Sequence, residues 1–289
     1  MILDTSRRIG FHVSIGGRLS RAVDRALERG CTAFQIFCGN PRGWRLQARG
    51  EDEVRAFRSG RAQAGLDPLI VHACYLINPC ARGPIVRRRS IRRLAGELAL
   101  SAALGADSYV LHPGSQRGRP LGWAVRRAAE AIGEALDRAG DAPALLLENT
   151  ASRHGPGGDV AALGDLVLRL RDQTPGARVG LTLDSCHAFA AGYDLREAEE
   201  VERLVGDIAS AIGLERVGLI HVNDSRDPPG SRRDRHEHVG LGTIGRAGLA
   251  NLLNHPALSG QPLILETPWE SVETDRLNLE RTLALLAAP

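Results

Sequence analysis

Residues 108–148, SYVLHPGSQRGRPLGWAVRRAAEAIGEALDRAGDAPALLLE, contain the pattern that decides the fold. Two short apolar runs, SYVLH and ALLLE, stand at its ends, and neither alternates between apolar and polar residues as a half-exposed strand does. Between them, residues 124–140 repeat apolar positions at helical spacing and end on Gly140, a residue typical of a helix C-terminus. The segment therefore predicts a buried strand, an amphipathic helix and a second buried strand.

The same alternation extends along the whole chain. Six further apolar runs are IGFHV (9–13), AFQIF (33–37), PLIVH (68–72), VGLTLD (179–184), VGLIHV (217–222) and PLILE (262–266). Helical patterns, such as those at 20–30 and 92–105, lie between runs. Eight strands alternating with helices in 289 residues predict an α/β fold, a (β/α)8 TIM barrel formed by a single domain over residues 1–289. A doubly wound open sheet is the alternative.

The composition is that of a globular protein and excludes several classes. The chain is 43% hydrophobic and 25% charged, its formal charge is +3, and no apolar run approaches the length that spans a bilayer. Five cysteines without a CxxC pair, and no apolar signal core in MILDTSRRIGFHV, predict a reduced, cytoplasmic location. The chain contains no lysine, so no side-chain amine is available for Schiff-base catalysis.

Six consecutive runs carry a residue that can bind a metal ion at their last position or, for His221, at the last position but one. These residues, spaced 36 to 45 positions apart, are His72, His112, Glu148, Asp184, His221 and Glu266. Because the C-terminal ends of barrel strands converge on one mouth, where such folds place their active sites, we expect the six side chains to gather there.

Two local pairs add further candidates to the same mouth. His187 follows Asp184 by three residues, and Asp234 and His236 lie in the polar loop after the seventh run. The resulting five imidazoles and four carboxylates exceed the needs of one tetrahedral zinc ion and suit two or three catalytic Zn²⁺ or Mn²⁺ ions. Such a cluster predicts metal-dependent hydrolysis of a phosphate ester, because the ions lower the pKa of water and neutralise charge on the departing oxygen.

Eight stretches, in this order and spacing, resemble the signatures of the endonuclease IV family, the abasic-site DNA endonucleases of the trinuclear-zinc type. They are GFHVSIGG (10–17), HACYLIN (72–78), VLHPGS (110–115), LLLENTA (145–151), TLDSCHAFAAGYDL (182–195), HVNDS (221–225), GSRRDRHEHVGLGTIG (230–245) and LILET (263–267). The resemblance covers residues 9–267. One departure is Ala73-Cys74, where the family has more polar residues; it puts lesion preference in doubt but touches no ligand.

The resemblance implies three zinc ions, with Mn²⁺ as an alternative at one site. His72, His112 and Glu148 would hold the first, with Glu148 bridging to a second that Asp184, His221 and Glu266 complete. His187, Asp234 and His236 would hold the third. Glu148, Asp184 and Glu266 are the candidate catalytic carboxylates.

The resemblance also implies a reaction on double-stranded DNA. A hydroxide between the ions would cleave the phosphodiester 5′ to an abasic site, leaving a 3′-hydroxyl and a 5′-deoxyribose phosphate, and blocked 3′ ends would also be trimmed. By motif position, Arg42 and Tyr75 would fill the gap left by the flipped nucleotide. No membrane and no obligate protein partner are expected.

Other interpretations remain open at this stage. A divalent-metal sugar isomerase or epimerase could use a similar barrel but needs fewer ligands, and a non-enzymatic DNA-damage binder would favour cysteine ligands. Residues 240–245 match GxGxxG, but they follow a charged loop, so we interpret them as a turn before a helix near Arg246. His12 is expected to support a ligand or contact phosphate, with a role in core packing as the alternative. Cys74 and Cys186 are expected not to bind metal. The arginines at 87–89, 92 and 93 are expected to form a solvated helix face, with contact to the DNA backbone as the alternative.

Overall fold

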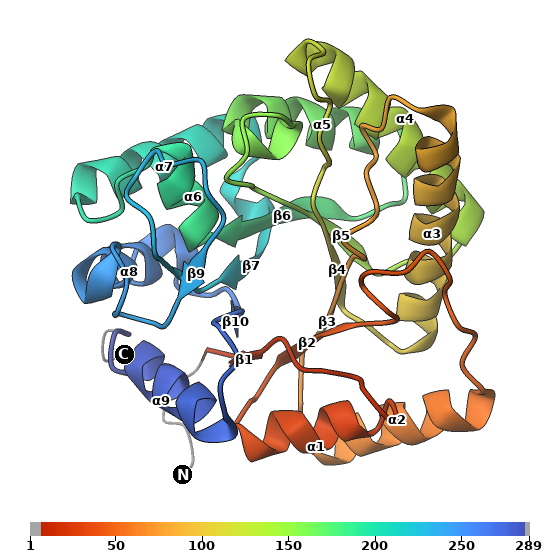
Figure 1. Cartoon of the computed structure of the whole chain (residues 1–289), viewed down its shortest axis with the longest axis horizontal. Helices are drawn as coiled ribbons and strands as arrows, with labels where there is room; N and C mark the ends of the chain where they lie inside the picture. Colours follow the sequence, from red (N-terminus) through yellow and green to blue (C-terminus); the bar gives the residue numbers. More distant parts are fainter. Residues whose placement is uncertain (1–6, 287–289) are drawn as a thin grey trace.

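Eight parallel strands form the sheet that the apolar runs predict. The structure is a computed structural model that describes residues 7–286. The strand order is β1-β10-β7-β6-β5-β4-β3-β2, which is the chain order of the runs wound into a ring (Figure 1). The strands are β1 (Ile9–Phe11), β2 (Phe34–Phe37), β3 (Leu69–His72), β4 (Ser108–Leu111), β5 (Ala144–Glu148), β6 (Val179–Asp184), β7 (Val217–His221) and β10 (Leu263–Leu265).

The ring is closed between β1 and β2 by a single parallel bridge. His12 pairs with Gln35 there, and the backbone N–H of Val13 donates to the Gln35 carbonyl at 2.8 Å. Because the two terminal strands of the sheet meet, the predicted barrel is confirmed and the open-sheet alternative is wrong. The predicted domain bounds, 1–289, include residues 1–6 and 287–289, which lie outside the described part of the chain.

Helices surround the strands on the outside of the barrel (Figure 1). Their apolar faces are buried against the sheet, as in α4, where Ala128, Ile132 and Ala135 are inaccessible to solvent or nearly so and Gly140 ends the helix with φ +73°. The helices are α1 (Arg21–Glu28), α2 (Glu51–Gln63), α3 (Pro84–Ala103), α4 (Leu121–Ala139), α5 (Val160–Gln173), α6 (Ser185–Ala191), α7 (Ala198–Ala211), α8 (Gly245–Leu253) and α9 (Val272–Leu283). Among the described residues, no helix is both long and apolar enough to cross a membrane.

The inside of the barrel has an apolar floor beneath a polar layer. The floor consists of six buried side chains that form a cluster separate from the core between sheet and helices: Ala33, Ile70, Val110, Leu146, Leu219 and Ile264. Since side chains alternate along a strand, the residue two positions after each floor residue also points inward, one layer nearer the mouth. Those residues include five of the predicted ligands. The alternation of side chains along each strand therefore places these five ligands one layer above the apolar floor, at the mouth.

The loop after β7 contains a hairpin that the sequence analysis did not predict. The two-residue strands β8 (Asp224–Ser225) and β9 (His236–Glu237) pair antiparallel. The hairpin returns the chain to the mouth and delivers Asp234 and His236 beside the other predicted ligands.

Candidate metal centre

All nine predicted ligands lie in three groups at the mouth of the barrel. In each group, the potential ligand atoms lie within 4.8 Å of one another. The groups are His72, His112 and Glu148; Glu148, Asp184, His221 and Glu266; and His187, Asp234 and His236. The geometry therefore brings together, in the predicted combinations, residues separated by as many as 118 positions in the chain, as Glu148 and Glu266 are.

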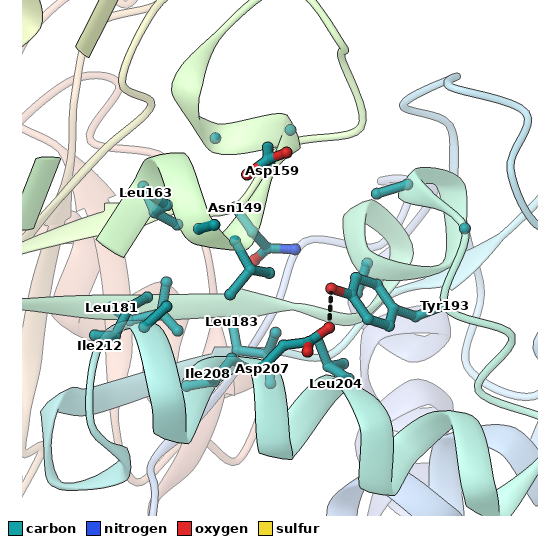
Figure 2. A pocket seen from close by; sticks show the side chains of 18 of the residues that line it. Asn149, Asp159, Leu163, Leu181, Leu183, Tyr193, Leu204, Asp207, Ile208 and Ile212 are labelled. Atoms are coloured by element: carbon teal, nitrogen blue, oxygen red, sulfur yellow. Dashed lines mark hydrogen bonds between the residues drawn. The ribbon is translucent and has the colours of Figure 1, made fainter. Parts of the chain in front are cut away.

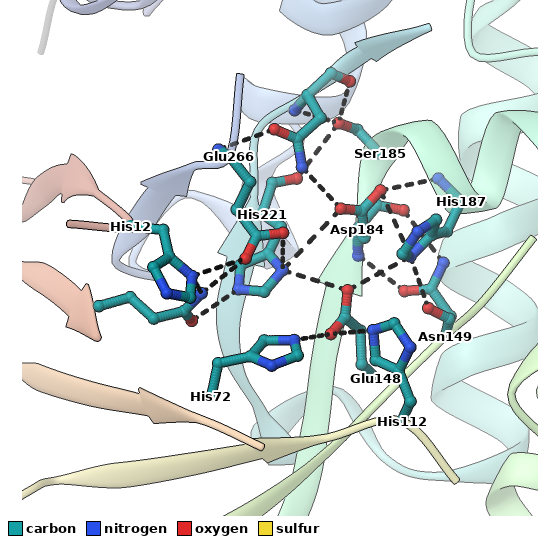
Figure 3. Close-up of polar contacts among 12 residues, drawn as sticks. His12, His72, His112, Glu148, Asn149, Asp184, Ser185, His187, His221 and Glu266 are labelled. Carbon is teal, nitrogen blue, oxygen red and sulfur yellow. Dashed lines mark hydrogen bonds and ion pairs between the residues drawn. The ribbon is translucent and has the colours of Figure 1, made fainter. Parts of the chain in front are cut away.

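Glu148, at the end of β5, is the residue that joins the groups (Figure 3). Its Oε2 lies 3.0 Å from His112 Nε2 and 3.4 Å from His72 Nε2. Its Oε1 lies 3.2 Å from both His221 Nδ1 and His187 Nδ1. The side chain is fully buried, so one carboxylate faces imidazoles on two sides in a low-dielectric setting. Such a carboxylate is placed to bridge two ions.

The third group depends on the turn from β6 into α6. The Asp184 carboxylate caps the helix by accepting from the His187 N–H at 2.7 Å, which fixes the position of His187 at the mouth. His187 Nε2 then lies 3.1 Å from Asp234, and Asp234 lies 3.2 Å from His236 Nε2. One short helix thus connects the central group to the hairpin.

Several imidazoles are oriented by backbone carbonyls on the side away from the cluster. His72 Nδ1 lies 2.9 Å from the Ala73 carbonyl, and His236 Nδ1 lies 3.0 Å from the Glu266 carbonyl. Because a carbonyl only accepts, each ring carries its proton on Nδ1 and turns the free lone pair of Nε2 toward the cluster. Metal-ligating histidines are characteristically oriented in this way.

Three buried amide side chains support the ligands and were missed by the sequence analysis. Asn149 accepts from the Asp184 N–H at 2.7 Å, and Asn223 donates to the Asp184 carboxylate at 2.7 Å and accepts from the Glu266 N–H at 2.9 Å. Gln35 contacts Glu266 and His221. The available signal was position, since Asn149 directly follows a strand-end ligand and Asn223 lies two residues after one. The predicted supporting role of His12 agrees with its Nδ1 lying 3.3 Å from Glu266 Oε1.

Orphaned polar atoms show that the residues present fit divalent ions. Glu148 Oε2, His187 Nε2 and His236 Nε2 are buried and form no hydrogen bond within the described chain, although other potential ligand atoms face them. Buried polar atoms without a hydrogen bond are costly, and ligand atoms that converge without hydrogen-bond geometry are arranged around a common point. The mixture of imidazole nitrogen and carboxylate oxygen is typical of catalytic zinc.

The cluster contains buried negative charge that positive charge must balance. Burial alone raises the pKa of Glu148, but the imidazoles of His112, His221 and His187 outweigh this effect and hold its pKa well below the usual range. Burial lowers the pKa of His221, yet Glu266 and Glu148 raise it to about 9. The Glu148 carboxylate therefore keeps its negative charge, which either protons on the imidazoles or bound cations must balance.

The two predicted DNA-contacting residues lie together on the rim of the mouth. Arg42 is exposed in the loop after β2, and Tyr75, 61% exposed, is in the loop after β3. The Tyr75 N–H donates to the carbonyl of Pro41 at 3.1 Å, so the loops are joined directly. The Tyr75 ring also packs edge-on against Phe37, with 5.1 Å between centroids. The geometry thus places a cation and an aromatic ring side by side at the entrance.

A buried ion pair on α3 holds both rim loops. Arg93 Nε lies 2.7 Å from Glu97 Oε1, and both side chains are almost inaccessible. Arg93 also donates to the Asn40 carbonyl at 3.3 Å, and Glu97 accepts from the Cys74 N–H at 3.1 Å. The prediction that Arg93 lies on a solvated face is wrong, because α3 turns this side chain toward the barrel, whereas its neighbour Arg92 is exposed.

The cysteines and the glycine-rich turn have structural roles. All five cysteines are free and buried. The Cys74 thiol points away from the cluster, 3.1 Å from the Pro41 carbonyl. The Cys186 thiol forms a further group of potential ligand atoms with Asp184 and His236, and burial raises the pKa of this thiol to about 12. Backbone N–H groups of Gly242, Ile244 and Gly245 donate to the Asp224 carboxylate, and α8 starts at Gly245, so these glycines form the predicted turn.

A large cavity lies outside the barrel and away from the cluster. It has a volume of about 570 Å³ between β6, α5 and α7, and its lining combines apolar side chains such as Leu163 and Ile208 with polar ones such as Asp207 (Figure 2). A hydrogen bond of 2.8 Å joins Tyr193 and Asp207 at one side. Asn149 lines the cavity with one face and holds Asp184 with the other, but no predicted ligand borders it. The predicted ligands therefore lie outside this cavity.

The barrel with a ligand cluster at its mouth defines the class of protein. Residues 23–288 match the xylose isomerase-like TIM barrels. Within that class, the chain is 42% identical over 282 residues to a "Probable endonuclease 4" of Methanoculleus marisnigri, covering 97% of this chain and 99% of the relative. A second "Probable endonuclease 4", from Halothermothrix orenii, is 40% identical over 262 residues, covering 90% and 93%. The chain belongs to the endonuclease IV family.

A solved structure agrees with this assignment. The crystal structure of endonuclease IV from Thermus thermophilus superimposes with a TM-score of 0.85 at 40% sequence identity, covering 96% of this chain and 98% of that one. The resemblance stated from the sequence motifs is therefore confirmed, and the chain is an enzyme of this family.

Proposed function

We propose that the chain is a zinc-dependent DNA-repair endonuclease that hydrolyses the phosphodiester 5′ to an abasic site. The products would be a 3′-hydroxyl and a 5′-deoxyribose phosphate. The observation that carries the proposal is the convergence of three ligand groups, two of which share Glu148, on orphaned nitrogen and oxygen atoms. The names of the relatives support the nuclease activity.

The residues that would hold the ions are the nine that the sequence singles out. His72, His112 and Glu148 would hold one ion; Glu148, Asp184, His221 and Glu266 a second; and His187, Asp234 and His236 a third. Nitrogen and carboxylate ligands favour Zn²⁺, with Mn²⁺ as an alternative at one site. Bound ions supply Lewis-acid chemistry, which lowers the pKa of water and neutralises charge on the phosphate and the leaving oxygen.

The chain's own residues would bind and orient the DNA. Arg42 and Tyr75, whose loops are joined at the rim by the hydrogen bond from the Tyr75 N–H to the Pro41 carbonyl, would enter the duplex where a base is missing, because unstacking costs least at such a position. With no lysine in the chain, imine-based strand cleavage lacks a side-chain amine. We extend the proposal to double-stranded DNA with blocked 3′ ends, since the same phosphodiester chemistry would trim them.

A duplex containing one tetrahydrofuran abasic analogue tests the proposal on a denaturing gel. The analogue cannot undergo imine-based elimination, so any nick is hydrolytic. We expect a nick on its 5′ side that leaves an end which a polymerase extends. An intact strand, from protein shown to carry its ions, would contradict the proposal and favour a sugar isomerase, which has no need of the His187, Asp234 and His236 group.

A further inference from the structure

Gln35 occupies, on β2, the position that predicted ligands occupy on other strands. The apolar floor of the barrel contains Ala33 on β2, Ile70 on β3 and Leu219 on β7. Two positions later come Gln35, His72 and His221, all directed into the polar layer by the alternation of side chains along a strand. Gln35 is inaccessible to solvent. A buried amide in this layer needs polar partners, and its partners identify its role.

All the partners of the Gln35 side chain belong to the cluster or touch it. Gln35 Oε1 lies 3.0 Å from His221 Nε2. Gln35 Nε2 donates to Glu266 Oε1 at 2.6 Å and lies 2.9 Å from His12 Nδ1. One amide therefore connects the ends of β1, β7 and β10 across the barrel.

The chemistry of the amide fixes the state of each partner. An amide oxygen only accepts, so His221 must carry a proton on Nε2 and, in its neutral form, present the lone pair of Nδ1. That nitrogen faces the cluster, 3.2 Å from Glu148 Oε1 and 3.3 Å from Glu266 Oε2. The amide N–H meanwhile occupies Oε1 of Glu266 and leaves Oε2 directed at the cluster.

We propose that Gln35 is a positioning residue for the central ion site, which determines that His221 binds through Nδ1 and Glu266 through Oε2. The inference rests on the proposed metal centre and adds to it a residue that touches two ligands but no ion. The two contacts share one rigid amide, so the orientation of His221 and that of Glu266 are coupled. Loss of Gln35 should release both ligands together, and the other two ion sites should remain intact.

Zinc titration of chelator-treated protein tests this coupling. The variants are Gln35→Met, which keeps the length but has no hydrogen-bonding group, and Gln35→Asn, which keeps the amide but is one methylene shorter. Thr182→Val is the matched control, since Thr182 is also buried inside the barrel and its hydroxyl makes no hydrogen bond within the described chain. Competition with a chromophoric chelator gives the number of ions and the affinity of each.

We expect both Gln35 variants to bind one of three ions about 10–100-fold more weakly and Thr182→Val to match the wild type. The visible absorption of Co²⁺ in that site should change as well, because its ligand set is rearranged. If Gln35→Met fails to fold, as judged by circular dichroism, Gln35→Asn carries the test. Wild-type affinity and Co²⁺ spectrum in a folded Gln35 variant would overturn this inference alone, whereas a wild-type protein that binds no ions would overturn the proposed metal centre.

Discussion

The nine clustered side chains and the rim pair lie at the same mouth, but they are held in different ways. The cluster is built on strand ends, and its side chains are fixed by backbone carbonyls and buried amides at 2.6–3.0 Å. The rim pair, Arg42 and Tyr75, is exposed on loops, which a buried ion pair on α3 fixes from behind. The cluster side chains are thus held by short hydrogen bonds, whereas the rim side chains are exposed to solvent. The chemical step and lesion recognition should therefore respond to different mutations.

Glu148→Gln is expected to separate the effect on hydrolysis from the effect on DNA binding most strongly. The variant loses the charge that two ion groups share, so hydrolysis should fall by about 10⁴-fold, equivalent to about 5.5 kcal/mol of barrier. Binding to abasic duplex, measured by fluorescence anisotropy, should change little because the rim is untouched. Glu270→Gln, an exposed carboxylate, is the control and should cleave normally. Zinc-dependent turnover at the wild-type rate in Glu148→Gln would remove this residue from the centre.

The ion pair behind the rim gives the second test. Arg93→Met leaves the Glu97 carboxylate buried without its cation, which should cost about 3–5 kcal/mol of unfolding free energy. The loops carrying Arg42 and Tyr75 would lose their support, so the preference for abasic over intact duplex should also fall. Arg92→Met, one residue away and exposed, should do neither. An unchanged preference for abasic over intact duplex in a folded Arg93→Met protein would show that the rim loops keep their conformation without this ion pair.

Removal of the ions should destabilise the cluster but leave the rim as it was. An ion present at 100 times its Kd stabilises the folded state by about 2.7 kcal/mol, because it binds the native site and not the unfolded chain. Chelation should therefore lower the melting temperature of the wild type and of Arg42→Ala by the same amount. A melting temperature indifferent to chelation would contradict a metal centre in this cluster.

The smallest effect is expected from Arg42→Ala. Affinity for abasic duplex should fall by about 10-fold, or about 1.4 kcal/mol, with a smaller loss on intact duplex and no loss of bound zinc. Arg45→Ala, an exposed arginine of the same loop, controls for general phosphate attraction and should weaken both duplexes equally. Equal losses for Arg42→Ala would reduce its role to phosphate contact.

The sequence predicted the cluster well because its ligands follow two strong regularities. Strand ends in a parallel barrel converge, and charged residues that close apolar runs, such as Glu148 and His221, are visible without knowledge of contacts. The amides were not visible in this way, because Gln35 lies inside an apolar run and carries no charge. The β8–β9 hairpin was missed because two-residue strands have no periodicity. The burial of Arg93 depends on which face α3 turns inward, and a run of arginines does not reveal that face.

The bridge between His12 and Gln35 couples local opening of the barrel to the ligand cluster at its mouth. Every other pair of neighbouring strands is joined by a longer ladder, whereas β1 and β2 share one bridge, with backbone hydrogen bonds from Thr32 and Ala33 to the Ile9 carbonyl below it. We expect local opening of a closed sheet to begin where two strands share the fewest backbone pairs, which here is between β1 and β2. The two bridged residues, His12 and Gln35, both contact Glu266 through their side chains. Amide hydrogen exchange at Val13, whose N–H closes the seam, would then follow the assembly of the mouth, so that barrel closure and site formation are one equilibrium observed at two points.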